Sequence, residues 1–405
     1  MNPTQSRNIL HWSDTRTRSL AVAILVGAGI PLGPAWGAEY TITNLGTLGG
    51  AISSAYGLND AGTVVGDSVP AGLKPEEAFR YQVGSMIGLG TLAGGARGRA
   101  YDINESGTIV GQAYFPDLLL FKAFTYRNGV MQEIGTLGGP GSSAYAINQS
   151  GWIVGSADTD SGVFHAFLLR EGMMTNLGTL GGDSSAAYDL NDGGIVVGSS
   201  ANAAGVNRAF RYDGTMVDLG TLGGKSSDAY AINAGGLIVG SANTADGAVH
   251  AFRHDGTMHD LGTLGGPRSF ANDVNANGII VGSSPRVPGG DFHAFVYDCS
   301  MRDLNDLIPP NSGWLLNHAV AINAQGQIAG NGFFNGLPQA FLLTPTPAIT
   351  YSVKPDGTIE VTSGSNLSEA NELYGPYVDL GVKTVTINPA TENGNRFFRS
   401  AANVE

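Results

Sequence analysis

Residues 177–218 read LGTLGGDSSAAYDLNDGGIVVGSSANAAGVNRAFRYDGTMVD, and variants of this stretch recur along the chain. The opening LGTLGG element, altered in some copies, returns every 42–45 residues. Its copies begin at Leu45, Leu89, Ile134, Leu177, Leu219, Leu261 and Leu304. Two further markers also occur seven times, an asparagine after a short apolar run and an Ala-Phe pair. A fixed period of this length is typical of repeat architectures.

Each repeat predicts four short β-strands. In the quoted unit these strands are expected at residues 186–190, 195–199, 209–212 and 216–219, separated by turns rich in Asn, Asp and Gly. Four antiparallel strands in about 43 residues are typical of one β-propeller blade. The sequence therefore predicts an all-β, seven-bladed β-propeller over residues 39–344, with a β-solenoid as the structural alternative.

The two ends of the repeat region predict how the ring closes. An additional strand is expected at Tyr40–Leu45, before the first complete unit, whereas the last unit stops at Thr344-Pro345 without its fourth strand. The N-terminal strand would complete the seventh blade, which leaves no free sheet edge. An open solenoid offers no reason for this complementarity.

Composition narrows the function classes. The chain of 405 residues has 61 glycines, 14% charged residues and a net charge of −13. High apolar content with little charge argues against disorder, and an acidic chain without basic runs argues against a nucleic-acid partner. A glycine recurs after the second strand of every unit, where we expect it to let neighbouring blades approach closely. These glycines are Gly66, Gly111, Gly155, Gly198, Gly240, Gly282 and Gly330.

Residues 1–38 are typical of a secretory signal peptide. Arg7, Arg16 and Arg18 precede an apolar stretch at residues 20–30, and Ala35-Trp36-Gly37 supplies small residues for cleavage. A disordered N-terminal tail is the alternative. The signal predicts a secreted protein, extracellular or at the cell surface with the periplasm also possible, and no membrane span is expected after its removal.

The markers resemble a known family. Seven Ala-Phe pairs, the Gly-Thr-Leu-Gly-Gly elements and the Ile-Asn-x-x-Gly turns are similar to the bacterial extracellular HAF-repeat family, named for a His-Ala-Phe tripeptide that His165, His250 and His293 complete here. The resemblance covers residues 40–344. It implies secretion and a propeller, and it brings no catalytic residues. Four units depart from the tripeptide, with Glu77, Lys122, Arg208 and Gln339 in the histidine position.

Residues 345–405 lie outside the repeat. Thr344-Pro345-Thr346-Pro347 is typical of a short stiff linker. Strands are expected at residues 349–353, 358–362, 383–387 and 396–399, with a hairpin turn at Pro355-Asp356-Gly357. We expect a small β-rich C-terminal module, which serves either attachment and sorting or only stability.

No motif predicts a catalytic, cofactor or metal site. Equivalent positions in a propeller are spread around a ring, so the three histidines cannot converge on one metal ion, and a structural role at the strand edge is expected. The Asp-x-Asn-x-x-Gly elements, such as Asp102-Asn104-Gly107, offer too few oxygens for calcium and are expected to form turns.

The loops between the second and third strands vary while the rest of the unit repeats, and variable loops on a rigid scaffold usually carry binding. They hold the candidate ligand-binding residues Tyr114, Phe115, Phe121, Phe164, Phe292, Phe333 and Phe334. We expect a non-enzymatic scaffold that binds an extracellular glycan, a surface protein or an envelope component. These aromatic residues could instead pack onto the ring. A propeller-fold polysaccharide lyase or glycosidase and a structural spacer are the other functional hypotheses.

Overall fold

The computed structural model of the protein describes residues 39–72 and 75–346, together with the backbone of short strands between residues 349 and 400. The predicted signal peptide, residues 1–38, lies outside these residues. Within the described part of the chain, no helix is long and apolar enough to cross a membrane.

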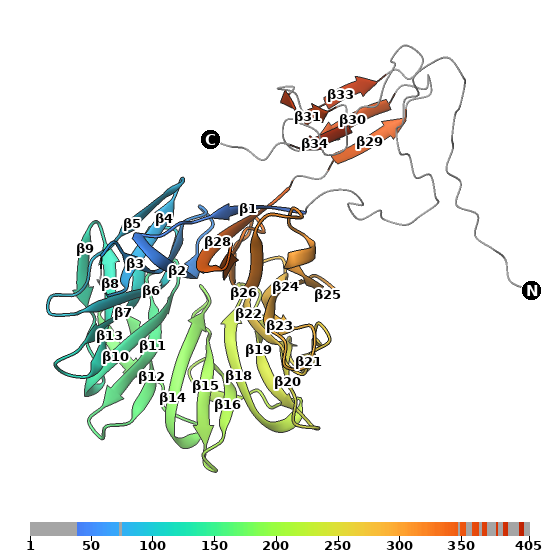
Figure 1. The fold of residues 1–405 in the computed structure, drawn as a ribbon. Coiled ribbons are helices and arrows are strands. Elements are labelled where there is room, and N and C mark those ends of the chain that lie inside the picture. Colours follow the sequence, from blue (N-terminus) through green and yellow to red (C-terminus); the bar gives the residue numbers. More distant parts are fainter. Residues whose placement is uncertain are drawn as a thin grey trace, which may run out of the picture. The chain divides into compact units, whose positions relative to one another are not determined.

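Residues 40–345 form a seven-bladed β-propeller, as predicted, with four antiparallel strands in each blade (Figure 1). Blade 1 contains β2 (Gly49–Leu58), β3 (Val64–Pro70), β4 (Glu77–Gln82) and β5 (Ser85–Gly88). Blade 2 contains β6 (Arg97–Ile103), β7 (Ile109–Phe115), β8 (Leu120–Arg127) and β9 (Val130–Glu133). Blade 3 contains β10 (Gly138–Ile147), β11 (Ile153–Thr159), β12 (Phe164–Arg170) and β13 (Met173–Asn176).

The same order continues in the remaining blades. Blade 4 contains β14 (Gly181–Leu190), β15 (Val196–Asn202), β16 (Asn207–Tyr212) and β17 (Met216–Asp218). Blade 5 contains β18 (Gly223–Ile232), β19 (Ile238–Thr244), β20 (Val249–His254) and β21 (Met258–Asp260). Blade 6 contains β22 (Phe270–Val274), β23 (Ile280–Pro285), β24 (Phe292–Tyr297) and β25 (Met301–Asp303), followed by a 3₁₀ turn at Leu304–Asp306.

Blade 7 combines the two ends of the repeat region. It contains β26 (Trp314–Ile322), β27 (Ile328–Phe334) and β28 (Leu337–Pro345), and β1 (Tyr40–Asn44) pairs with β28 as the fourth strand (Figure 1). The Leu45 N–H donates to the Ala340 carbonyl at 3.1 Å, which continues this pairing past the end of β1. The predicted closure by the N-terminal strand is therefore confirmed.

The first strand of every blade is innermost in the ring, because first strands of successive blades contact one another all the way round. Strand direction alternates within a blade, so the turns between second and third strands lie on the same face as the connections between blades. We call this the b–c face. The turns between first and second and between third and fourth strands lie on the opposite face.

The Ala-Phe pair builds the core. Each phenylalanine of the seven pairs has no exposed surface, because it lies on the third strand between neighbouring sheets. These residues are Phe79, Phe124, Phe167, Phe210, Phe252, Phe295 and Phe341. Burial of a phenylalanine side chain contributes about 1.5–3 kcal/mol to folding.

The glycine after the second strand has a different role from the predicted one. A Cβ atom at Gly198 would overlap the backbone oxygen of Ala186 and the ring of Phe210, and both of these residues belong to the same blade. The other six glycines of this column likewise meet only their own blade. The expectation that they let neighbouring blades approach was wrong. They make room for the blade's own inner strand and phenylalanine ring.

The repeated asparagines form a closed ring of hydrogen bonds. Each side-chain Nδ2 donates to the backbone oxygen of the asparagine in the next blade, at 2.9–3.3 Å. Asn323 closes the ring by donating to Asn59 at 3.1 Å. Each Oδ1 accepts the amide four residues later, as from Ile195 to Asn191 at 3.1 Å. All seven side chains are buried, so these bonds satisfy polar groups that water cannot reach.

The C-terminal segment forms two three-stranded sheets, ordered β29-β30-β33 and β32-β31-β34. Their strands are β29 (Ile349–Val353), β30 (Ile359–Ser363), β31 (Leu367–Ala370), β32 (Val378–Asp379), β33 (Thr384–Ile387) and β34 (Phe397–Ser400). The sequence predicted four of these strands to within about a residue and missed β31 and β32. The predicted hairpin turn at residues 355–357 lies outside the described residues.

Candidate functional site

The aromatic residues predicted on the variable loops lie at the ends of strands. In blade 2, β7 extends to Phe115 and β8 begins at Leu120, so the loop between them is only four residues long. Tyr114 and Phe121 are directly opposite each other in this ladder, and their ring centroids are 5.2 Å apart. The structure therefore holds these two rings on paired strands.

The seven aromatic candidates are distributed over blades 2, 3, 6 and 7. Phe164, at the start of β12, is half exposed. Phe292 is partly buried, because it packs between Phe270 and His318 with ring centroids at 5.9 and 5.4 Å. Tyr114, Phe121 and Phe164 line the two cavities described below.

Phe292 and the remaining three candidates do not line either cavity. Phe115, in blade 2, has Lys122 Nζ 5.3 Å from its ring centroid. Phe334, in blade 7, packs on Trp314 with the ring centroids 5.2 Å apart, and the neighbouring Phe333 is exposed. The structure therefore does not bring all seven residues into one patch.

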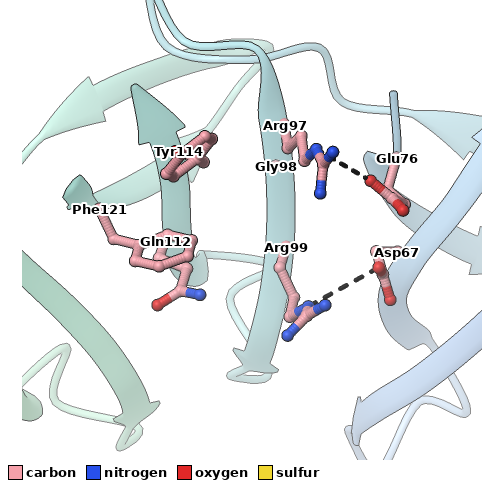
Figure 2. A pocket seen from close by; sticks show the side chains of 8 residues that line it. All are labelled: Asp67, Glu76, Arg97, Gly98, Arg99, Gln112, Tyr114 and Phe121. Carbon is pink, nitrogen blue, oxygen red and sulfur yellow. Dashed lines mark ion pairs between the residues drawn. The ribbon is translucent and has the colours of Figure 1, made fainter. Parts of the chain in front are cut away.

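The first cavity, which we call the arginine cavity, opens at the b–c face of blades 1 and 2 and has a volume of about 260 Å³. Figure 2 shows two arginines of β6 turned toward two carboxylates of blade 1, with the aromatic rings on the other side of β6. Its lining residues are Asp67, Glu76, Arg97, Gly98, Arg99, Gln112, Tyr114 and Phe121. Three strands of blade 2 thus supply the cationic, amide and aromatic groups, whereas blade 1 supplies the carboxylates.

Two long ion pairs cross this cavity. Arg97 Nε lies 3.4 Å from Glu76 Oε2, and Arg99 Nε lies 3.6 Å from Asp67 Oδ2. The Arg99 guanidinium also lies over the Tyr56 ring, 5.3 Å from its centroid. The Arg99 side chain is 43% exposed, so it remains accessible from the cavity.

Asp67 is the buried partner in this arrangement, with only 6% of its surface exposed. Its Oδ1 atom has no hydrogen-bond partner among the described residues. Burial raises the pKa of the Asp67 carboxyl, and Arg99 acts in the opposite direction. The Tyr56 hydroxyl also donates to this carboxyl, so only part of its bonding capacity is left for a ligand.

A local departure from the repeat accompanies this cavity. In five other blades a serine in or directly before the first strand accepts a hydrogen bond from the Ala-Phe alanine amide of the preceding blade, as in Ala166 N to Ser185 Oγ at 2.8 Å. Blade 2 has Gly98 at this position, between Arg97 and Arg99. The missing side chain and the two arginines make this unit different from its neighbours. The departure is visible in the sequence as Arg97-Gly98-Arg99, although it was not part of the prediction.

The second cavity, which we call the serine cavity, lies at the same face between blades 2 and 3 and has a volume of about 330 Å³. Its lining residues are Leu120, Phe121, Gly141, Ser142, Ser143, Tyr145, Ser156, Ala157, Asp158 and Phe164. Phe121 lines both cavities, and its ring is 44% exposed. The two cavities therefore form neighbouring parts of one surface on blades 1–3.

An arc of tyrosines lies on the inner strands, and the sequence analysis missed it. The residues are Tyr56, Tyr101, Tyr145, Tyr188 and Tyr230, one in each of blades 1–5, with successive ring centroids 5.4–6.0 Å apart. Each is the additional residue of a β-bulge in the first strand. Their constant spacing, three residues before the marker asparagine, was the available signal.

The histidine column has the structural role that we expected. His165, His250 and His293 each pair through Nδ1 with an Asn or Asp near the end of the fourth strand of the same blade, at 3.1, 2.8 and 2.6 Å. Where the tripeptide is altered, Lys122 pairs with Glu133 and Arg208 with Asp218, at 3.1 and 3.8 Å. A cross-strand polar pair accounts for these five of the seven positions in the column.

The aspartates of the Asp-x-Asn-x-x-Gly elements also join blades. Asp102, Asp189 and Asp273 each accept the backbone amide of an isoleucine in the next blade at 2.7–2.8 Å. Burial raises the pKa of all three carboxyls, to about 6 for Asp273. Within the part of the chain that the structure describes, no group of three or more His, Cys, Asp or Glu side chains is placed to hold a metal ion.

Comparisons with known proteins give only distant structural similarities. No family model matches the chain, and no curated protein matches its sequence. The propeller is similar to that of TolB from Acinetobacter baumannii, with 12% identity, a TM-score of 0.38, and coverage of 73% of this chain and 67% of the other. The β-propeller domain of the Trilobed protease from Pyrococcus furiosus has 13% identity and a TM-score of 0.35, covering 64% of this chain and all of that domain.

The acylaminoacyl peptidase from Pyrococcus horikoshii has 10% identity and a TM-score of 0.45. The similarity covers 78% of this chain but only 58% of the peptidase. The propeller fold of this chain rests on its own strand order and ring closure, and these distant similarities add nothing to it.

Proposed function

We propose that the protein is a secreted, non-enzymatic binding scaffold that contacts an extracellular partner through the b–c face of blades 1–3. The observation that carries this proposal is that the arginine and serine cavities open side by side on this face and share Phe121. Exposed aromatic rings beside fixed polar groups are typical of binding surfaces.

The extracellular location rests on the sequence alone. The signal-like residues 1–38 and the resemblance to the HAF-repeat family both support secretion. A polysaccharide, a surface protein or an envelope component would meet such a protein outside the cell.

The proposal is tested by measuring two things together: whether polysaccharides or envelope material bind the protein, and whether the protein cleaves them. The purified chain is assayed against a panel of soluble polysaccharides by affinity electrophoresis and against cell-envelope preparations by co-sedimentation, and released products are quantified. We expect retention by at least one of these materials without new reducing ends or unsaturated products. Turnover would replace the proposal with a lyase or glycosidase, and the absence of all retention would favour a structural spacer.

Two matched variants locate the binding surface. Phe121 and Phe333 have similar exposure, 44% and 41%, but lie in blades 2 and 7. We expect Phe121→Ala to reduce retention at least tenfold and Phe333→Ala to leave it unchanged. The opposite result would move the binding surface to blade 7.

A further inference from the structure

We infer that the arginine cavity binds one or two residues of an uncharged saccharide. This inference rests on the proposed function, because it assigns a ligand chemistry to part of the same face. It follows from three features of the cavity: the balance of its charges, the alternation of donors and acceptors, and the aromatic wall.

The charges of the cavity balance. Arg97 and Arg99 each lie within 4 Å of a carboxylate, so two positive groups are matched by Glu76 and Asp67. An anionic ligand would be attracted by the two arginines but repelled by the two carboxylates. A cationic ligand would be attracted by the carboxylates but repelled by the arginines. A ligand without net charge avoids this uncompensated repulsion.

The polar groups alternate between donors and acceptors. Arg99 and Gln112 are directly opposite each other on β6 and β7, and Asp67 lies across from Arg99. A guanidinium only donates and a carboxylate only accepts, whereas each sugar hydroxyl does both. Adjacent hydroxyls of a pyranose therefore match an adjacent guanidinium and carboxylate, and Asp67 Oδ1 offers an acceptor with no partner among the described residues.

An aromatic wall flanks these groups. Tyr114 and Phe121 pack against each other at 5.2 Å and both line the cavity beside Gln112 (Figure 2). The C–H face of a pyranose is apolar and its edge is polar, so it requires an apolar surface next to hydrogen-bonding groups. A pocket with apolar walls and a few well-placed polar groups is the usual arrangement for small-molecule binding.

The test measures binding of short oligosaccharides by the full chain. Isothermal titration calorimetry compares neutral gluco-, manno- and galacto-oligosaccharides of three to four residues with oligogalacturonates. We expect one neutral series to bind and the oligogalacturonates to bind at least tenfold more weakly. Tighter binding of the uronates would overturn the assignment of an uncharged ligand.

Two variants separate this cavity from the rest of the surface. Arg99→Met should weaken oligosaccharide binding at least tenfold. The matched control Arg211→Met removes an exposed arginine that pairs with Asp213 at 2.8 Å in blade 4, and it should leave binding unchanged. Equal affinity of Arg99→Met and the unmodified chain would overturn the inference.

The folding of the variants is checked by thermal unfolding, because Arg99→Met leaves Asp67 without its ion pair. If this variant does not fold, Tyr114→Leu tests the aromatic wall of the same cavity without removing a charge, and it should also weaken binding at least tenfold. Retention of a polysaccharide or envelope preparation that no neutral oligosaccharide displaces would overturn the inference and leave the proposed function intact. Loss of all retention would contradict both.

Discussion

Single asparagines hold neighbouring blades together, and Asn191 illustrates what each of them contributes. Its Nδ2 donates to Asn233 O at 3.3 Å and its Oδ1 accepts from Ile195 N at 3.1 Å, inside a buried region. Asn191→Ala leaves a buried donor and a buried acceptor without partners, so we expect unfolding free energy to fall by about 2–4 kcal/mol. Urea denaturation measures this loss, and Asn207→Ala on the exposed edge of β16 is the control. A similar small effect in both variants would contradict the role of the ring.

Asp273 predicts how stability changes with pH. Burial raises its pKa from 3.8 to about 6 in the folded protein, so between these values the folded chain holds a proton that the unfolded chain has lost. Stability therefore rises as pH falls from 7 toward 4.5, because linkage favours the state that binds more protons. A shift of this size corresponds to about 3 kcal/mol.

The comparison with Asp273→Asn isolates this effect from other titrations. The variant loses one acceptor at every pH but no longer titrates at this position. We expect the unmodified chain to gain about 2–3 kcal/mol relative to the variant between pH 7.5 and pH 4.5, measured by chemical denaturation. Parallel pH profiles would show that the carboxyl titrates normally.

Residue identities predicted the core better than they predicted the site. The seven Ala-Phe pairs and asparagines stood out by repetition, and both proved to hold the blades together. The arginine cavity depends on residues that do not repeat, Arg97, Gly98 and Arg99, and on Asp67 of the preceding unit. Spacing along one unit could not reveal this pairing, because the two units meet only after the ring folds.

At the scale of elements, the third and fourth strands of each blade are joined by a polar pair at the histidine position. Arg208 pairs with Asp218 in blade 4 where His250 pairs with Asp260 in blade 5. Because an aspartate is already in place, we expect Arg208→His to change unfolding free energy by less than about 0.5 kcal/mol. We expect Asp218→Lys to lower it by about 1 kcal/mol, because like charges then face each other across the strands. Thermal unfolding of both variants checks this, and a large loss for Arg208→His would contradict the pairing.

Strand lengths were the least accurate part of the sequence prediction. Tyr114, Phe115 and Phe121 were expected on the loop between the second and third strands, but β7 and β8 include all three and leave only residues 116–119 as the loop. Aromatic and β-branched residues near a loop favour extension of the ladder, because cross-strand neighbours such as Tyr114 and Phe121 stabilise each other. Turn residues mark the centre of a loop more reliably than its ends.

At the scale of the whole molecule, the ring depends on a strand from the opposite end of the repeat region. A chain of residues 45–346 lacks β1 and would expose the outer edge of β28, whereas residues 39–346 retain it. We expect the longer chain to unfold cooperatively and to remain monodisperse. The shorter one should unfold at a lower temperature and self-associate, because an exposed strand edge pairs with other chains. Light scattering and calorimetry compare the two, and identical behaviour would contradict closure by β1.

The whole-molecule prediction succeeded because period and strand count are global properties of the sequence. Seven starts at 42–45 residues, with one strand in excess before them and one missing after them, were sufficient to predict the closed seven-bladed ring. The part of the b–c face that differs chemically from the rest could be identified only from the structure.

The asparagine ring also bears on how such a gene can change. Each asparagine bonds only the main-chain carbonyl of its neighbour, so this one contact between two units does not depend on the side chains that the neighbour carries. Exchange of one unit for another would keep this contact, whereas the buried phenylalanines and the aspartate bonds between blades would still have to fit the new neighbour. Residues that take no part in the asparagine ring can vary from unit to unit. Arg97 and Arg99, on the b–c face, are such residues in an otherwise repetitive sequence.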